Sequence, residues 1–308
     1  MNIIHPLAYV FLPYYVKELT RIYLCNINLA HYTKLDAGIS ILNNKEIWLR
    51  NITKMNDDQE VKCGLKLFKD FLYNNYSLYN DLINIMDSIG KNKEYWNNLL
   101  DELIENFYEK YAKHTYILSL TEYKYVQTIN LDLFYRFCRD KGITFVFNSK
   151  FVNPYSKILN LSRVVYFNEL EFRNEFIKLI SSIKQNVDYL KSDKHDIDLI
   201  EHFFKQAIFF AILSIKSPEF KIENEWRIVY CDKINNKDST NEIIVEDNKK
   251  IKGQIEKIYK IKFDKLGKFD LVKNIIAVNC TKKEIANIED KINNWKYYNG
   301  IENINITK

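Results

Sequence analysis

The chain has 308 residues, enough for one large domain or two modest ones with a substantial core and no need of disulfides. Its 45 Lys and Arg residues against 40 Asp and Glu give a net charge of +5, a mild bias toward polyanions such as RNA. Glycines number only 7, and neither a P-loop nor a dinucleotide-binding glycine fingerprint occurs, so a nucleotide would need a different kind of site.

The cysteines and the apolar segments indicate the cellular compartment in which the protein is expected. No close cysteine pair suggests a zinc or redox centre, because the five are scattered as Cys25, Cys63, Cys138, Cys231 and Cys280. Residues 1–16 lack a basic leader and a small-residue cleavage site, and the longest apolar run, 207–215, is far below the roughly 18 residues of a membrane span. We expect a cytoplasmic protein with packed, reduced thiols and no membrane contact.

The first third of the chain predicts a strand–helix start followed by a helical insertion. Hydrophobic spacing indicates a helix over 33–43 and a strand over 46–50. A polar turn at 55–58 precedes helices over 59–75 and 82–111, so residues 58–112 read as an α-rich insertion. We interpret Asn56, Asp57 and Glu60 as a helix cap rather than as ligands.

The remainder predicts most of the sheet and a pair of long helices. Strand patterns occur at 115–120, 143–148, 164–167, 226–231, 242–245, 257–263 and 272–279. Helical patterns occur at 130–139, 169–189 and 196–216, and Thr281 with Glu284 forms a capping box before a last helix. The loop 232–240 reads as a solvated hairpin connection. Residues 1–308 are thus predicted to form one α+β domain around a mixed, mainly antiparallel sheet, with helical insertions at 58–112 and 169–216.

The segment Glu223-Asn224-Glu225-Trp226-Arg227 is the most informative, because two carboxylates stand two residues apart before an apolar strand. Side chains at that spacing share one face of a strand, so both carboxylates would border one cleft. Composition alone favours the alternative, in which Glu223 and Glu225 are solvated charges at the strand entry and Arg227 is a cross-strand partner.

Several segments together resemble a family of bacterial proteins that often occur among phage-defence genes. The resemblance spans residues 30–230 and rests on His31-Tyr32-Thr33, Ile47-Trp48-Leu49, Met55-Asn56-Asp57 with Glu60, Ser119-Leu120-Thr121-Glu122, Leu133–Phe137 before Gly142, and Lys216–Phe220 leading into Glu223–Arg227. The same order resembles the ADP-ribosyltransferase fold, with a His on the first strand, a Ser/Thr or Tyr element, and a late Glu-x-Glu.

That resemblance implies a toxin-like or anti-phage ADP-ribosyltransferase that uses NAD+ as substrate, with no metal. Glu225 would stabilise the ribosyl cation that forms when the nicotinamide bond breaks, and Glu223 would orient or deprotonate the acceptor. His31 would hydrogen-bond the ribose with the support of Thr33. A ring of Tyr32 or Tyr135 would stack on the nicotinamide, and Ser119 and Thr121 would brace the pocket.

Each of these residues also has a structural reading. His31 could be a satisfied histidine near a helix start, Glu223 an exposed charge, and the Ser119–Thr121 pair mere cross-strand packing. His114, His195 and His202 have no partner at metal-ligand spacing and are read as structural.

The partners and the alternatives follow from the same residues. RNA is the first expected acceptor and protein the next; Lys and Arg would then line the approach to Glu225. An antitoxin or immunity protein is a candidate partner. The alternatives are an NAD+ glycohydrolase, a metal-dependent nuclease with Asp57, Glu60, Glu223 and Glu225 as ligands, and a binding module without activity.

Overall fold

The fold is built on one antiparallel sheet in a computed structural model that describes residues 4–54, 58–123, 130–148, 159–192, 196–234, 244–251, 253–263 and 272–299. Seven strands run in the order β11-β4-β1-β3-β2-β10-β9, and β8 and β5 attach to β3 in turn. Their bounds are β1 Asn28–Lys34, β2 Glu46–Asn51, β3 Thr115–Tyr123, β4 Gly142–Phe147, β5 Asn160–Arg163, β8 Glu225–Cys231, β9 Ile244–Ile251, β10 Gln254–Lys262 and β11 Val272–Val278. The predicted α+β class with a mainly antiparallel sheet is confirmed.

The sheet divides at β3. β8 pairs with one edge of β3 from Thr115 to Thr121. The other edge therefore takes both remaining partners: β1 pairs with residues 121–123, and β2 pairs with residues 116–117. Between these two stretches, the described strands leave residues 118–120 of β3 unpaired on that edge. β1 and β2 diverge from there, so the sheet itself opens a gap.

The two faces of β3 and β8 belong to two different cores, because side chains alternate along a strand. Leu118, Leu120, Trp226 and Ile228 join a sheet core with strands β1, β2, β4, β10 and β11. Helices α3 (Leu35–Asn44) and α11 (Lys282–Asn299) contribute to that core. The capping box that begins α11 is confirmed, since the Thr281 N–H donates to Glu284 Oε2 and the Glu284 N–H donates to Thr281 Oγ1.

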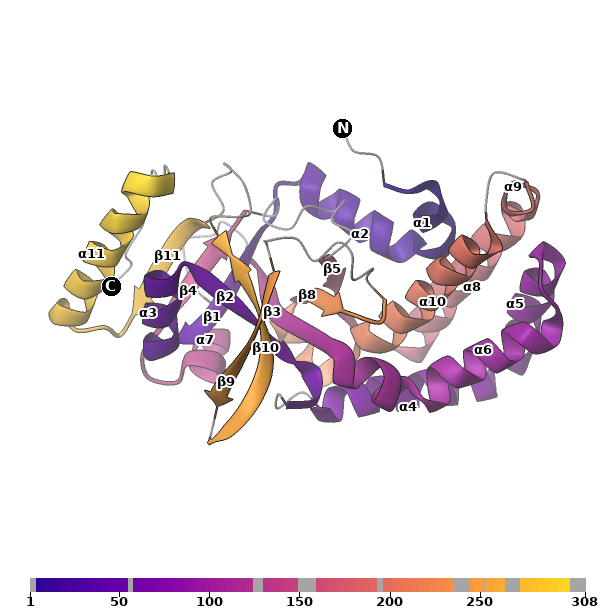
Figure 1. Ribbon diagram of the computed structural model, residues 1–308, viewed down its shortest axis with the longest axis horizontal. Coiled ribbons are helices and arrows are strands. Elements are labelled where there is room, and N and C mark those ends of the chain that lie inside the picture. Colours follow the sequence, from indigo (N-terminus) through magenta and orange to yellow (C-terminus); the bar gives the residue numbers. More distant parts are fainter. Residues whose placement is uncertain are drawn as a thin grey trace.

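The opposite face of β3 and β8 packs on a layer of helices, which Figure 1 shows beside the sheet. The layer contains α1 Pro6–Phe11, α4 Asp58–Asn74, α5 Tyr76–Ile89, α6 Lys93–Glu105, α8 Glu169–Gln185, α9 Val187–Leu190 and α10 Ile197–Ser214. Ile117 and Val229 join its apolar core. The predicted insertion and the predicted helical pair therefore pack together as one body. The alternation places Ser119, Thr121, Glu225 and Arg227 on this same face, at the border between sheet and helices.

Three short elements complete the region around β8. β6 (Val165–Tyr166) and β7 (Ile215–Lys216) form a two-stranded parallel ladder, and a 3-10 segment, η5, covers Pro218–Glu223. α7 (Leu131–Cys138) lies before β4, and α2 (Pro13–Leu24) precedes β1. The first two helices begin at Pro6 and Pro13. Proline suits a first helical position, because an amide hydrogen there would have no acceptor within the helix.

Some predicted boundaries and one predicted connection are wrong. The helix expected over 33–43 begins at Leu35 because β1 continues to Lys34. The strand expected over 164–167 is reduced to the two residues of β6, the preceding strand β5 was not expected, and residues 215–216 leave α10 to form β7. The loop 232–240 does not join a hairpin, because β8 pairs with β3 and β5, whereas β9 pairs with β10. Residues 235–243 lie outside the described part of the chain.

Gly142, the first residue of β4, gives a first prediction, because α7 and β1 pack so closely against it that a side chain has no room. A Cβ there would lie 2.5 Å from Cys138 Cβ and 2.6 Å from the Thr33 carbonyl oxygen. We expect Gly142→Ala to lower the free energy of unfolding by about 1–3 kcal/mol through overpacking. Urea denaturation checks this, with Asp140→Ala on the neighbouring exposed turn as the control. Equal stability of both variants would contradict the tight packing at this position.

Candidate functional site

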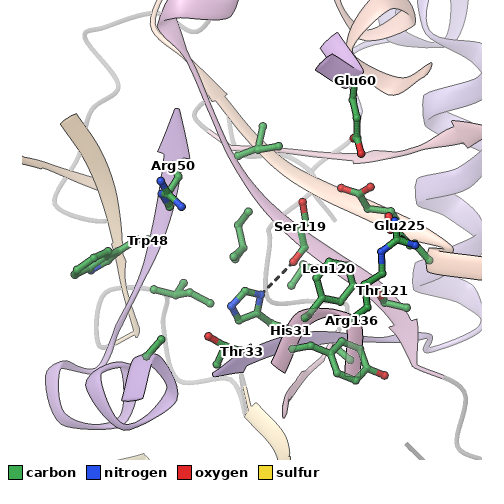
Figure 2. A pocket seen from close by; sticks show the side chains of 18 of the residues that line it. His31, Thr33, Trp48, Arg50, Glu60, Ser119, Leu120, Thr121, Arg136 and Glu225 are labelled. Atoms are coloured by element: carbon green, nitrogen blue, oxygen red, sulfur yellow. Dashed lines mark hydrogen bonds and ion pairs between the residues drawn. The ribbon is translucent and has the colours of Figure 1, made fainter. Parts of the chain in front are cut away.

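The opening between β1, β2 and β3 holds a cavity of about 910 Å³. Its walls come from β1, β2 and β3, from α3, α4 and α7, and from the segment that leads from β7 into β8. The cavity is within the size range of small-molecule sites, about 300–1,000 Å³. Figure 2 shows His31 at its centre, Trp48 and Arg50 to one side, and Glu60, Arg136 and Glu225 to the other.

Glu223 and Glu225 both reach this cavity, and both are buried, with 3% and 4% of their surface exposed. The strand begins at Glu225, so Glu223 lies in η5 rather than on a shared strand face. Lys216 nevertheless joins the two carboxylates, since its Nζ lies 2.6 Å from Glu223 Oε2 and 3.1 Å from Glu225 Oε2. The reading of two solvated charges is therefore wrong.

Arg227 completes the binding of Glu225 from the same strand. Its Nε donates to Glu225 Oε1 at 2.8 Å, and the two side chains share a face because they are two residues apart. The alternative reading made Arg227 a cross-strand partner of these charges, whereas the structure pairs it with Glu225 along the same strand, β8. Its Nη1 also donates to the Leu213 carbonyl, which anchors it to the end of α10.

Glu60 is the third carboxylate of the site. From α4, it lies 2.7 Å from Lys216 Nζ through Oε1 and 2.8 Å from Arg227 Nη2 through Oε2. The predicted helix cap is not tested, because Asn56 and Asp57 lie outside the described residues, but the carboxylate of Glu60 also has partners that the sequence did not suggest. Glu60, Glu223 and Glu225 are called the carboxylate cluster below. Arg136 of α7 adds a more exposed cation, with Nη1 3.2 Å from Glu223 Oε1.

The two late glutamates titrate in opposite directions. Burial tends to raise the pKa of Glu225, but the charges of Arg227 and Lys216 outweigh burial and hold that pKa at about 2. Burial also raises the pKa of Glu223, and there the hydrogen bond and charge of Lys216 only partly oppose it. Glu225 therefore stays ionised at neutral pH, whereas Glu223 takes up a proton more readily. Such a division suits a charge stabiliser beside a proton acceptor.

The backbone between the two glutamates is fixed on several sides. Asn224 has a left-handed conformation, φ 41°, and its Oδ1 accepts a hydrogen bond from Arg163 Nη2 at 3.1 Å. The Glu225 N–H donates to the Tyr166 hydroxyl at 2.8 Å, and the Glu225 carbonyl accepts from the Val164 N–H at 2.9 Å. Both backbone groups of Glu225 are thus held, which limits movement of its carboxylate.

His31 lies on β1 and bridges the gap in the sheet. Its Nδ1 lies 3.2 Å from the Ser119 carbonyl oxygen, on the edge of β3 that lacks a strand partner there. A carbonyl only accepts, so Nδ1 carries the hydrogen and the neutral ring keeps an acceptor lone pair at Nε2. Burial lowers the pKa of His31, which keeps the ring neutral. The histidine is satisfied on one side and faces the cavity, where Figure 2 shows the bond.

The other predicted site residues divide into those that line the cavity and one that does not. Tyr32, Thr33, Ser119 and Thr121 line it. The Tyr32 ring already stacks on Phe137, with centroids 6.4 Å apart. Tyr135 is 54% exposed and does not line the cavity, so it is not placed to stack on a ligand there. Its neighbours on α7, Arg136 and Phe137, do line it.

Several lining residues were given no site role by sequence reasoning. They are Trp48, Arg50, Arg136, Lys216 and Phe220. The sequence did contain a signal for Lys216. A single lysine directly follows the apolar run 207–215, and a lysine buried together with such a run needs a carboxylate partner. The Phe220 ring lies close to two cations, since Arg136 Cζ and Lys216 Nζ are each 4.8 Å from its centroid.

The nuclease alternative named Asp57, Glu60, Glu223 and Glu225 as metal ligands. The structure brings the last three together, but around the ammonium of Lys216, and Asp57 lies outside the described residues. In the part of the chain that the structure describes, no three His, Cys, Asp or Glu side chains are arranged to hold a metal ion. Within the same part, no helix is long and apolar enough to cross a membrane.

Comparisons of the chain with protein-family models, with curated proteins and with solved structures gave no match.

The low pKa of Glu225 predicts a pH-dependent stability. It is about 2 in the folded protein against the ordinary 4.5, so the ionised carboxylate stabilises the fold above pH 4.5. That contribution is lost as the pH falls through 4.5 toward 2. The difference in unfolding free energy between the wild type and Glu225→Gln should shrink by about 2 kcal/mol between about pH 5 and about pH 3.

Urea denaturation at the two pH values measures this difference. Glu219→Gln makes the same chemical change on an exposed side chain of η5 and serves as the control. A difference for Glu225→Gln that does not change with pH would show that its carboxylate is not held ionised by Arg227 and Lys216.

Proposed function

We propose that the protein is an NAD+-dependent ADP-ribosyltransferase whose nicotinamide ribose binds between His31 and Glu225. One observation carries the proposal: these two residues, far apart in the sequence, line one cavity where β1 and β2 diverge from β3. This is the placement that the resemblance implies for a first-strand histidine and a late Glu-x-Glu.

The reaction breaks the bond between ribose C1′ and the nicotinamide nitrogen, and the electron pair leaves with nicotinamide. The ribose then carries positive charge, shared between C1′ and its ring oxygen. A buried carboxylate that is already ionised stabilises this charge without reorganising. Glu225 meets the requirement, because its pKa of about 2 keeps it ionised and its backbone is fixed on both sides.

The acceptor then attacks C1′ and must lose a proton. Glu223 lies beside Glu225 through their common partner Lys216, and its raised pKa makes it the better proton acceptor of the two. Neutral His31 supplies an acceptor at Nε2 for a ribose hydroxyl while its Nδ1–H stays bound to Ser119.

The cavity lining does not match the basic approach expected for RNA. Its basic side chains are Arg50, Arg136 and Lys216, whereas its acidic side chains are Glu46, Glu60, Glu219, Glu223 and Glu225. An acidic excess repels a phosphate backbone, so the proposal takes protein before RNA as the macromolecular acceptor.

The test of the transferase uses NAD+ labelled in its adenylate half, with RNA, DNA or cell protein offered in parallel. Glu225→Gln should lower transfer by about 100-fold or more, because the swap keeps the shape but removes the charge. Glu289→Gln, the same change on an exposed side chain of α11 that does not line the cavity, should retain activity. A folded Glu225→Gln protein with normal turnover would overturn the proposal.

The distribution of label decides among the alternatives. Label on protein or RNA identifies the acceptor, and free ADP-ribose alone would favour the NAD+ glycohydrolase. Cleavage of nucleic acid that stops in chelator, with NAD+ left intact, would favour the metal-dependent nuclease.

Glu223 gives a separate prediction about pH. Its pKa is raised by burial, so the transfer rate should fall on the acid side as Glu223 gains a proton, at a pH above the ordinary value for glutamate. Glu223→Gln should lower transfer by about 100-fold or more and abolish this acid limb, with little change in NAD+ affinity. Rates of the wild type and variant across the pH range provide the measurement. An unchanged acid limb in the variant would assign the titration to another group.

A further inference from the structure

We propose that Trp48 and Arg50 on β2 form a second subsite of the cavity, which binds the purine nucleotide end of the dinucleotide. The subsite rests on the proposed function, because the nicotinamide ribose is taken to lie beside Glu225. Trp48 would stack on the base, and Arg50 would donate a hydrogen bond to a phosphate oxygen.

The alternation of β2 presents these two side chains to the cavity. Ile47 and Leu49 are buried in the sheet core at 1% and 0% exposure. Trp48 and Arg50 alternate with them along the strand, so they point to the other face, where they are half-buried and line the cavity. The core therefore fixes the strand from one face, and the other face offers a rigid wall to a ligand.

The ring of Trp48 is held at its edge and over one face. Its Nε1–H donates to Glu46 Oε1 at 3.1 Å, and the Lys249 ammonium lies over the ring, 6.0 Å from its centroid. An indole held in this way keeps its other apolar face for contact. Such fixed aromatic faces are the platforms on which nucleotide bases stack, with little dependence on base identity.

Arg50 adds a buried donor, Nε, from which no described group accepts a hydrogen bond. Its Nη2 donates to Glu256 Oε2 at 2.8 Å and to the Lys54 carbonyl at 3.4 Å, which sets the plane of the guanidinium. Among the residues that the structure describes, its buried Nε has no hydrogen-bond partner. An unmet buried donor is unfavourable and calls for an explanation. A ligand oxygen in the cavity would satisfy it, and arginine donors suit phosphate oxygens.

The separation of the two ends favours an elongated ligand. Arg50 stands opposite Ile117 on β3, and Glu225 stands opposite Thr121. Four residues along a strand span about 13 Å. Figure 2 shows Trp48 and Arg50 on the far side of His31 from Glu225. A single ring cannot contact both ends, whereas a dinucleotide has a base and phosphates at one end and a second ribose at the other.

The experiment measures equilibrium binding of AMP and, separately, of nicotinamide mononucleotide by titration calorimetry without turnover. Trp48→Ala should weaken AMP binding by roughly 5- to 150-fold and leave nicotinamide mononucleotide within about threefold. Arg50→Gln should also weaken AMP. Arg50→Lys keeps the charge but lacks Nε, so it should lose AMP affinity as well. Trp48→Leu replaces the alanine variant if circular dichroism shows that the latter is unfolded.

The outcomes separate this subsite from the proposed function. Wild-type protein that does not bind AMP, or folded variants that bind it normally, would overturn the subsite even if NAD+ is cleaved. AMP binding that depends on Trp48 and Arg50 in a protein that leaves NAD+ intact would support the subsite and overturn only the proposed function. Equal weakening of both mononucleotides would contradict two separate ends.

Discussion

The site depends on the ammonium of Lys216, which lies within 3.1 Å of all three members of the carboxylate cluster. Without it, the buried Glu223 and Glu225 and the partly exposed Glu60 could not all remain ionised so close together, since like charges in a medium of low dielectric raise each other's pKa. Such buried pairs add little net stability, yet removing one partner leaves a costly unpaired charge. Lys216 therefore serves less to strengthen the fold than to fix which groups of the site are charged.

The sheet supplies the second constraint, because two strands, β1 and β2, pair with separate stretches of the same edge of β3. Pairing with β1 at one end and β2 at the other leaves backbone groups of β3 open to the cavity. His31 lies in that opening, and its Nδ1–H donates a hydrogen bond to the Ser119 carbonyl. A backbone group that would otherwise be unsatisfied thus fixes the orientation of a candidate binding residue.

Local patterns predicted the elements well, and the long-range contacts poorly. The buried stripe of α10, the capping box of α11 and the apolar run of β8 each follow from spacing within a few residues. The pairing of β8 with β3 and β5 depends on contacts between distant segments, which no local pattern specifies, and so a hairpin with β9 was wrongly expected. The same limit explains Glu60: next to a polar turn it resembles a cap, and only the packing of α4 against β7 reveals its partners.

The carboxylate cluster and its cations come from both the helical layer and the sheet, so the site forms only when the two pack together. Glu60 comes from α4, and Lys216 follows the end of α10, whereas Glu225 and Arg227 belong to the sheet. Before the helices dock, Glu225 lacks its partner Lys216 and Arg227 lacks Glu60. The charge state of the cluster therefore depends on the docking of the helical layer, and any chemistry that needs an ionised Glu225 would be confined to the fully assembled chain.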